Sequence, residues 1–341
     1  MSEINIRITG HAGRITLTRP EALNALTYDM ALAIEAAIDV WAEDPAVAMV
    51  VIDAEGERAF CSGGDIAKLY ETGREGDFAW GQAFWRDEYR LNAKLARYGK
   101  PIAAFMQGFT MGGGVGISCH SSHRVVGEST QIAMPENGIG LVPDVGGSLI
   151  LANAPDRLGL YLGLTATRMN AADAIHVGFA DTFVPQEAWP DLIARLERTG
   201  DAGLIAAAAQ TPPEGALGGA SEQTARLFAP DTLDAIRTAL EADGSEFAQS
   251  ALKKMSRNSP LSMAVFIEMM ARLRGKEIED ALDLEYCFVS RSMEYGDFLE
   301  GIRAQIIDKD RNPKWQHEWP GSVPQADIDR MLVETGFSLR A

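Results

Sequence analysis

Cysteine is scarce in this chain. Its 341 residues include only Cys61, Cys119 and Cys287, which lie far apart in the sequence. An odd and scattered set of cysteines argues against a disulfide framework and fits a reducing compartment. We therefore expect free thiols.

Long apolar runs and targeting segments are also missing. No uninterrupted apolar run is long enough to span a bilayer. The first ten residues, MSEINIRITG, have no basic region, no apolar core and no Arg-rich amphipathic pattern, so they resemble neither a signal nor a transit peptide. These features lead us to expect a cytoplasmic protein with no membrane partner.

Basic residues are too few to balance the acidic ones. The chain has 31 Lys and Arg against 48 Asp and Glu, a formal net charge of −17. Proteins that bind nucleic acid make phosphate contacts with clustered Lys and Arg. We therefore expect no nucleic-acid partner.

Several motifs that would indicate other chemistries are absent. The sequence has no GxSxG nucleophile elbow, no Walker A motif and no GxGxxG after a strand. Cys119, His120 and His123 lie close together, but their spacing matches no known zinc pattern and no second cluster follows. We expect no metal and no nucleotide-dependent chemistry.

The sequence alternates between strand and helix patterns over about its first 190 residues, which indicates an α/β layered fold. Residues 4–17 have the alternating pattern of a β-hairpin, and 47–53 form a buried type of strand. Residues 211–221, TPPEGALGGAS, have the composition of a linker, and only helix patterns follow as far as 308. These patterns predict two regions, a catalytic core over 1–210 and a helical region over 211–341.

Two glycine turns are the first candidates for chemistry. Gly112, Gly113, Gly114 and Gly116 follow a predicted strand, and the pair Gly63–Gly64 occurs in the same strand–turn–helix context. Glycine allows close backbone approach, and two fixed N–H groups aimed at one carbonyl oxygen stabilise the oxyanion that forms when the carbonyl is attacked. The two turns can supply one N–H each to an acyl-thioester carbonyl. The alternative is that these glycines serve only turns and packing.

Two carboxylates follow the second glycine turn, and each comes directly after a proline. Glu136 follows Pro135, and Asp144 follows Pro143. Proline fixes φ and stiffens the approach to each acid. A rigid and partly desolvated carboxylate can act as a general base or nucleophile, because burial raises its pKa toward the working range. For Asp144 the alternative is an ordinary turn residue, since Pro-Asp is common in turns.

Four motifs together resemble the enoyl-CoA hydratase/isomerase, or crotonase, superfamily. They occur in the expected order within roughly residues 4–185, and are TRPEALNAL (18–26), AFCSGGDI (59–66), KPIAAFMQGFTMGGGVGI (100–117) and AMPENGIGLVPDVGGS (133–148). The resemblance implies a spiral of repeated ββα units, here followed by a helical C-terminal region. It also implies an acyl-CoA substrate, no cofactor beyond the coenzyme A of that substrate, and a possible homo-oligomer.

The resemblance assigns roles to individual residues. It implies that the N–H groups of Gly64 and Gly113 form the oxyanion hole, and that two segments line the coenzyme A site. The coenzyme A residues that it implies are Leu23, Ala25, Ser62, Gly63, Asp65 and Ile66.

The closest resemblance within the superfamily is to the 3-hydroxyisobutyryl-CoA hydrolases of valine breakdown. Hydratases of the superfamily use two glutamates, and here Gly116 occupies the position of the first while Glu136 matches the second. Asp144 in PDVGGS and Glu88 in FWRDEYRLN (84–92) are similar to that subgroup.

The resemblance to this subgroup implies thioester hydrolysis. Glu136 would attack the carbonyl, giving a mixed anhydride, or would activate water, and the sequence leaves both routes open. Asp144 would bind the substrate hydroxyl or assist proton transfer, Glu88 would help to bind the acyl end, and Gly113 would also contact the substrate. The alternatives are an enoyl-CoA hydratase or isomerase, and a non-catalytic acyl-CoA-binding protein.

Overall fold

The computed structural model describes residues 3–340 and divides them into two compact units. Unit 1 comprises Met1–Asp65, Asp87–Ala133 and Arg168–Gly218, and unit 2 comprises Ile66–Arg86, Met134–Thr167 and Gly219–Ala341. Both units therefore draw on segments from before and after residue 210, where the sequence analysis set a single boundary. Whether 1–210 folds as a domain of its own stays a prediction.

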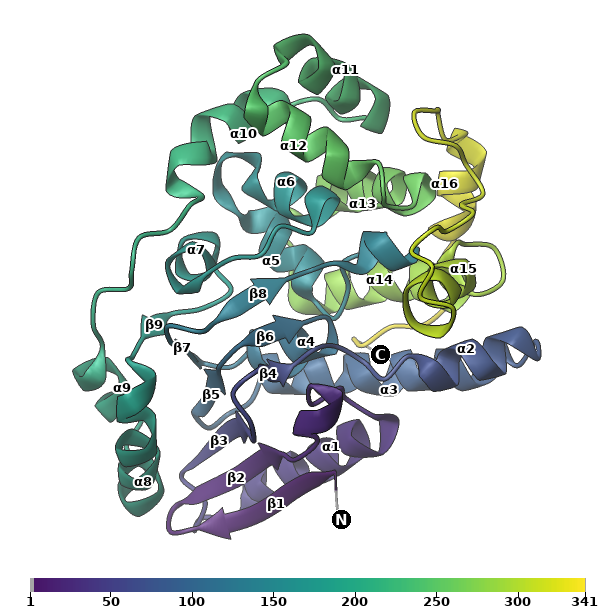
Figure 1. Ribbon diagram of the computed structural model, residues 1–341. Helices are drawn as coiled ribbons and strands as arrows, with labels where there is room; N and C mark the ends of the chain where they lie inside the picture. Colours follow the sequence, from purple (N-terminus) through teal and green to yellow (C-terminus); the bar gives the residue numbers. More distant parts are fainter. Residues whose placement is uncertain (1–2, 341) are drawn as a thin grey trace. The chain divides into compact units, whose positions relative to one another are not determined.

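Unit 1 contains two β-sheets, whose strands are labelled in Figure 1. The six-stranded sheet has the order β1-β2-β3-β5-β7-β9, and the three-stranded sheet has the order β4-β6-β8. The strands are β1 (Ile4–Thr9), β2 (Ala12–Leu17), β3 (Met49–Ala54), β4 (Ala59–Cys61), β5 (Ile102–Met106), β6 (Phe109–Met111), β7 (His123–Val126), β8 (Gln131–Ala133) and β9 (Thr182–Phe183).

Successive pairs of strands are divided between the two sheets. β3, β5 and β7 belong to the larger sheet, and the strand that follows each of them, β4, β6 or β8, belongs to the smaller one. Within both sheets these neighbours pair in parallel, whereas β1 and β2 pair antiparallel as the predicted hairpin. Helices follow each pair along the chain, which is the predicted ββα repeat. Because β4, β6 and β8 are parallel, their carboxyl ends lie along the same edge of the three-stranded sheet.

The larger sheet is buried on both faces, as expected for parallel strands with helices on either side. Successive residues of a strand point to opposite faces, so Met49 and Val51 pack into the cluster under α8 and α9, and Val50 and Ile52 are buried on the other side. The helices of unit 1 are η1 (Pro20–Ala22), α1 (Tyr28–Glu43), the second half of α3 (Phe78–Ala96), α4 (Gly113–Ser118), α7 (Ala171–Val177), η4 (Gln186–Ala188), α8 (Trp189–Thr199) and α9 (Gly203–Ala208), where η marks short 3₁₀ or π helices.

Unit 2 is helical in the part of the chain that the structure describes. Its core includes α13, whose Phe266 is fully buried, and Tyr161 of α6, which packs against Phe228 and Phe247. The helices are α2 (Ala67–Arg74), the first half of α3, η2 (Glu136–Ile139), α5 (Gly147–Asn153), η3 (Pro155–Arg157), α6 (Leu158–Thr165), η5 (Gly218–Ala220, of which Gly218 belongs to unit 1), α10 (Ser221–Leu227), α11 (Leu233–Asp243), α12 (Glu246–Met255), α13 (Pro260–Leu273), α14 (Ile278–Ser292), α15 (Phe298–Ile302), η6 (Arg303–Ile307) and α16 (Gln325–Met331). Figure 1 shows α10 to α13 following one another along the chain, which confirms the predicted helical region.

One predicted strand begins later than expected. The strand predicted over 47–53 starts at Met49, because Val47 closes the turn before it. The N–H of Val47 donates to the carbonyl of Asp44 at 3.1 Å. The N–H of Ala48 donates to the carbonyl of His11 at 2.8 Å and leads into the parallel pairing of Ala12 with Met49.

None of the helices in the described part of the chain is both long enough and apolar enough to cross a membrane.

Candidate active site

The Gly63–Gly64 turn follows β4 in unit 1. Gly63 has a φ of 119°, a left-handed conformation that L-residues with a side chain rarely adopt. Gly64 forms a parallel bridge with Leu26, in which the N–H of Leu26 donates to Gly63 at 2.8 Å and the N–H of Asp65 donates to Leu26 at 2.8 Å. This arrangement uses the carbonyl of Gly63 and the N–H of Asp65, whereas the N–H of Gly64 has no acceptor among residues 3–340.

The second glycine turn joins β6 to α4. Gly112 has a φ of 47° and ends the strand, so Gly113 becomes the first residue of α4. The N–H groups of Val115 and Gly116 both donate to the carbonyl of Gly112, at 2.7 and 3.2 Å, as the helix begins. The N–H of Gly113 precedes these bonds and has no acceptor in the part of the chain that the structure describes. First-turn N–H groups of helices commonly remain available in this way.

Unit 1 brings Gly113, Gly64 and Glu88 together. A Cβ atom added to Gly113 would lie 3.3 Å from the Gly64 nitrogen and 2.9 Å from Oε1 of Glu88. Glu88 comes from α3, and its side chain is buried. Three residues that the sequence analysis selected from separate motifs therefore share one location. The arrangement can present two N–H donors to one oxygen, with a carboxylate beside them.

The two segments implied in coenzyme A binding also lie side by side within unit 1. The N–H of Ser62 donates to the carbonyl of Leu23 at 3.0 Å, beside the bridge between Leu26 and Gly64. Arg19 joins the two segments, because it donates to the Ala25 carbonyl at 2.7 Å and lies 3.1 Å from the Asp65 carboxylate. Ile66, the last of the implied residues, belongs to unit 2 and immediately precedes α2.

Glu136 and Asp144 lie in unit 2 and are almost fully buried. Glu136 begins η2, which Asn137 anchors by donating its side-chain amide to the Gly163 carbonyl at 2.9 Å. Oε2 of Glu136 is buried and accepts no hydrogen bond from the residues that the structure describes. Burial and the charge of Asp144 raise the pKa of Glu136 well above its usual range, with a smaller contribution from Glu285. A carboxylate in this setting has a raised affinity for protons, as a general base or a proton-sharing pair requires.

Glu285 of α14 is a member of this cluster that the sequence analysis missed. It is fully buried, and its carboxylate accepts from the N–H of Gly146 at 2.9 Å and from the hydroxyl of Ser148. Burial and the charge of Asp144 raise its pKa well above the usual range. The signal was present in the sequence, because Glu285 interrupts a buried stripe with helical spacing that includes Leu282 and Phe288.

Cys119, His120 and His123 do not form a group of metal ligands among residues 3–340. The Cys119 thiol is buried 3.8 Å from the sulfur of Met106, and burial raises its pKa to about 12. His123 lies with Nδ1 3.0 Å from the hydroxyl of Ser122.

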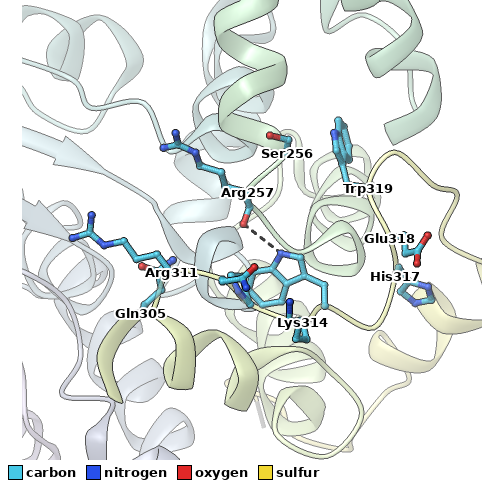
Figure 2. Close-up of a pocket in the computed structure, with 11 residues that line it drawn as sticks. Ser256, Arg257, Gln305, Arg311, Lys314, His317, Glu318 and Trp319 are labelled. Atoms are coloured by element: carbon cyan, nitrogen blue, oxygen red, sulfur yellow. Dashed lines mark hydrogen bonds between the residues drawn. The ribbon is translucent and has the colours of Figure 1, made fainter. Parts of the chain in front are cut away.

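Unit 2 also contains a cavity of about 940 Å³, shown in Figure 2. None of the predicted site residues lines it. The indole N–H of Trp315 donates to the carbonyl of Arg257 at 3.3 Å within it (Figure 2). The lining residues are Ser256, Arg257, Gln305, Arg311, Asn312, Pro313, Lys314, Trp315, His317, Glu318 and Trp319.

Comparison with known proteins decides the family. The family model described as enoyl-CoA hydratase/isomerase matches residues 12–332. The chain belongs to this family. The match confirms the resemblance, and it extends beyond the four motifs through the helical region that follows residue 211.

Relatives of the family with curated names are similar to this chain over nearly its whole length. The mitochondrial 3-hydroxyisobutyryl-CoA hydrolase of Xenopus tropicalis is 39% identical, over 96% of this chain and 88% of that protein. The human protein of the same name is 33% identical, over 98% of this chain and 90% of that protein.

Solved structures of the family share the fold and have different names. An enoyl-CoA hydratase from Rhodobacter sphaeroides 2.4.1 superposes with a TM-score of 0.95 and 54% identity, over 98% of both chains. A carnitinyl-CoA dehydratase from Mycobacterium thermoresistibile superposes with a TM-score of 0.94 and 36% identity, over 99% of this chain and 98% of that chain. The crotonase-like α/β fold is therefore confirmed.

Proposed function

We propose that this chain hydrolyses a 3-hydroxyacyl-CoA thioester, with 3-hydroxyisobutyryl-CoA as the substrate and 3-hydroxyisobutyrate and coenzyme A as products. The observation that carries the proposal is the buried pair Glu136 and Asp144, combined with Gly116 at the position where the family's hydratases have the first of their two glutamates. The curated hydrolase relatives, 33–39% identical over most of the chain, support it.

In this proposal the backbone of unit 1 polarises the thioester. The N–H groups of Gly64 and Gly113 donate to the carbonyl oxygen and stabilise the oxyanion as it forms, and each such donor contributes about 3 kcal/mol to lowering the barrier. Glu88, beside Gly113, contacts the acyl end. Leu23, Ala25, Ser62, Gly63, Asp65 and Ile66 line the coenzyme A site.

Glu136 acts on the carbonyl carbon by one of two routes. In the first, its carboxylate attacks and the thiolate of coenzyme A leaves. Water then hydrolyses the mixed anhydride, which regenerates the Glu136 carboxylate and releases the proton that the thiolate takes up. In the second, Glu136 removes a proton from water, which attacks directly. Asp144 binds the substrate hydroxyl or shares the proton with Glu136. Glu136 has a raised pKa, which suits a base in either route.

The second candidate function is hydration of an enoyl-CoA. The solved structure at 54% identity carries the name enoyl-CoA hydratase, and this favours the alternative. Hydration here requires Asp144 to replace the glutamate that Gly116 lacks. A protein that binds acyl-CoA without turnover is the third candidate, and the buried acids argue against it, because burying carboxylates is costly.

The deciding experiment is to measure thiol release from 3-hydroxyisobutyryl-CoA with a thiol reagent, alongside 3-hydroxypropionyl-CoA and crotonyl-CoA. The proposal expects rapid release from the first substrate and little from crotonyl-CoA. Loss of the enoyl absorbance of crotonyl-CoA without a free thiol would assign a hydratase instead. Tight binding of all three esters with no turnover would assign a binding protein.

The proposal also places the reaction in the cytoplasm, as part of valine breakdown, and allows a homo-oligomer. The names of the curated relatives include the word mitochondrial, so the compartment must be tested directly in this organism. Fractionation of the native cells with an antibody to the chain tests the compartment, and light scattering of the purified protein gives the oligomeric state.

A further inference from the structure

The loop that carries Asp144 is held in an unfavourable backbone conformation. Val145 has a φ of 52°, and Gly146 follows with 76°. A β-branched residue in the left-handed region is a genuine outlier and is strained, so the surrounding structure must enforce it. The turn closes through the N–H of Gly147, which donates to the Asp144 carbonyl at 2.7 Å.

The Glu285 carboxylate stabilises this turn from a distant part of the sequence. One of its oxygens accepts the N–H of Gly146 at 2.9 Å, and the other accepts the hydroxyl of Ser148. Both contacts are buried, and they fall on the residues that follow the strained Val145. Removing Glu285 would leave a buried N–H without its acceptor, and such groups favour rearrangement of the backbone.

A buried carboxylate is an expensive way to hold a turn if stability is its only purpose. A buried carboxylate close to two others carries both a desolvation cost and a repulsion cost, and its two oxygens serve two donors where a glutamine amide would offer one acceptor oxygen. An acid at this position therefore indicates a function for its charge or its geometry. We propose that Glu285 is a positioning residue of the reaction, which fixes the Asp144 carboxyl by holding the turn from Asp144 to Ser148.

This inference rests on the proposed function, because it assigns Asp144 a role in turnover. It concerns the same unit as Glu136 and Asp144, and the contacts that carry it lie within that unit. Glu285 touches neither substrate nor the reacting atoms in this role. Its effect on catalysis passes through Asp144.

The charge of Glu285 supports the role, because it acts on the pair directly. It raises the pKa of Glu136, and the charge of Asp144 in turn raises that of Glu285. Removing the charge should therefore lower the pKa of the Glu136–Asp144 pair. If turnover needs the ionised pair, the acid limb of the pH profile then moves to lower pH.

Other charged groups on the elements packed against α14 do not offset this effect. α5 carries no charged side chain, and the charged side chain in the unit 2 part of α3, Arg86, is exposed. The remaining groups pair or bond among themselves: Glu268 with Arg272 on α13, and Asp327 with Arg330 and Asp329 with Gln325 on α16. On α14 itself, Glu279, Asp280 and Asp283 lie outside the buried stripe, and Arg291 donates to the carbonyl of Cys287 at 2.9 Å.

The test compares Glu285→Gln with a matched control, Asp297→Asn. Asp297 is also buried in unit 2 and also accepts from one serine hydroxyl, that of Ser259 at 2.6 Å, and one backbone N–H, that of Gln316 at 2.9 Å. Its pKa is likewise raised by burial. The control therefore removes a buried charge with the same kind of donors, and the charges that act on Glu136 remain.

We expect Glu285→Gln to lower kcat for 3-hydroxyisobutyryl-CoA about tenfold or more and to change KM much less, because the turn loses its fixed geometry. The acid limb of kcat/KM should move to lower pH, because the charge of Glu285 no longer raises the pKa of Glu136. Asp297→Asn should leave that limb where it is in the wild type. A Glu285→Gln limb that does not move, with a loss of kcat no larger than in the control, would overturn the inference.

A second variant covers the case in which Glu285→Gln fails to fold. Glu285→Asp keeps the charge and shortens the side chain, so kcat should fall while the acid limb stays at or above its wild-type position. A downward shift in this variant would contradict the role of the charge. If the wild type hydrates crotonyl-CoA instead, the proposed function fails, and the same pH profiles measured by hydration still test Glu285 separately.

Discussion

At the scale of single residues, a methyl group added to Gly113 would crowd both Glu88 and the backbone of Gly64. A Cβ at Gly113 would lie 2.9 Å from Oε1 of Glu88 and 3.3 Å from the nitrogen of Gly64. Gly113→Ala should therefore obstruct the proposed oxyanion hole and lower kcat about 100-fold, the loss typical of one missing donor. Thiol release from 3-hydroxyisobutyryl-CoA measures this effect.

The matched control for this change is Gly99→Ala, also in unit 1. A Cβ at Gly99 meets nothing within 4 Å, and its φ is not left-handed. This variant should keep the wild-type rate. A Gly113→Ala enzyme that equals it would show that the N–H groups of the two turns do not act on the carbonyl.

Replacement of Glu136 separates binding from turnover. Glu136→Gln keeps the size of the side chain and removes the base, so we expect binding of a CoA ester to be retained and turnover to fall about 1,000-fold or more. Calorimetric titration with a non-hydrolysable CoA thioether measures binding, and the thiol assay measures turnover. Retention of full activity would remove Glu136 from the mechanism.

The pH dependence of activity follows from the same residue. The ionised form of Glu136 is the active one in both routes, and its pKa is raised by burial and by Asp144. kcat/KM should therefore fall as the pH drops through a value above the ordinary glutamate pKa of about 4.3. Rates measured from pH 4 to 9 locate this limb, and a limb at or below the ordinary value would contradict the coupling within the cluster.

At the scale of secondary-structure elements, the contact between α6 and α13 depends on a glycine. A Cβ at Gly163 would overlap the ring of Phe266, which is fully buried. Overpacking of a core typically costs 1–3 kcal/mol, whereas alanine in place of glycine gains about 1 kcal/mol in helix propensity. We expect Gly163→Ala to lower the melting temperature by several degrees in a thermal denaturation experiment.

Gly219→Ala, in η5 of the same unit, is the control for Gly163→Ala, since a Cβ at Gly219 meets nothing within 4 Å. Its melting temperature should match the wild type. If Gly163→Ala is equally neutral, Phe266 moves aside at little cost, and the close packing of α6 on α13 is not needed for stability.

Local signals were sufficient to predict most of the elements. Thr27 is a typical N-cap residue just before α1, and its hydroxyl accepts the N–H of Met30 at 3.3 Å. The hairpin of β1 and β2 and the helices after residue 221 were predicted from periodicity alone. α2 and α3 are separate helices, because Gly76 adopts a φ of 80° between them. These features depend on neighbours in the sequence, which the sequence displays directly.

The site was predicted in part, because only some of its residues are marked by their neighbours in the sequence. Glycines and prolines mark unusual backbone positions, so Gly64, Gly113, Glu136 and Asp144 could be selected by their neighbours. The family resemblance supplied Glu88. Glu285 could not be selected in this way, because its partner Gly146 lies 139 residues away in the sequence and only tertiary packing brings them together.

At the scale of the whole molecule, the carboxylate cluster should reduce stability at neutral pH. The folded-state pKa of Glu136 is raised, so the folded form binds the proton more tightly than the unfolded form does. Its stabilising effect is complete below the unfolded pKa and is lost as the pH rises through the folded pKa. Each unit by which the pKa is raised corresponds to about 1.4 kcal/mol.

At pH values above the folded-state pKa of Glu136, the Glu136→Gln protein should therefore be more stable than the wild type. This gain in stability should shrink at low pH. Melting temperatures at pH 5 and pH 8 test this, with Asp144→Asn as a second variant of the same pair. An equal change at both values would mean that Glu136 carries no ionisation cost in the folded protein.

The cavity in unit 2 should make the tryptophan fluorescence of this protein sensitive to quenching by anions. Two of the six tryptophans, Trp315 and Trp319, line it, and Arg257, Arg311 and Lys314 surround them. The chain as a whole, with a net charge of −17, repels anions, but at short range these cations attract them. Iodide should therefore quench these indoles more strongly than caesium does, whereas buried tryptophans such as Trp41 and Trp85 resist both ions.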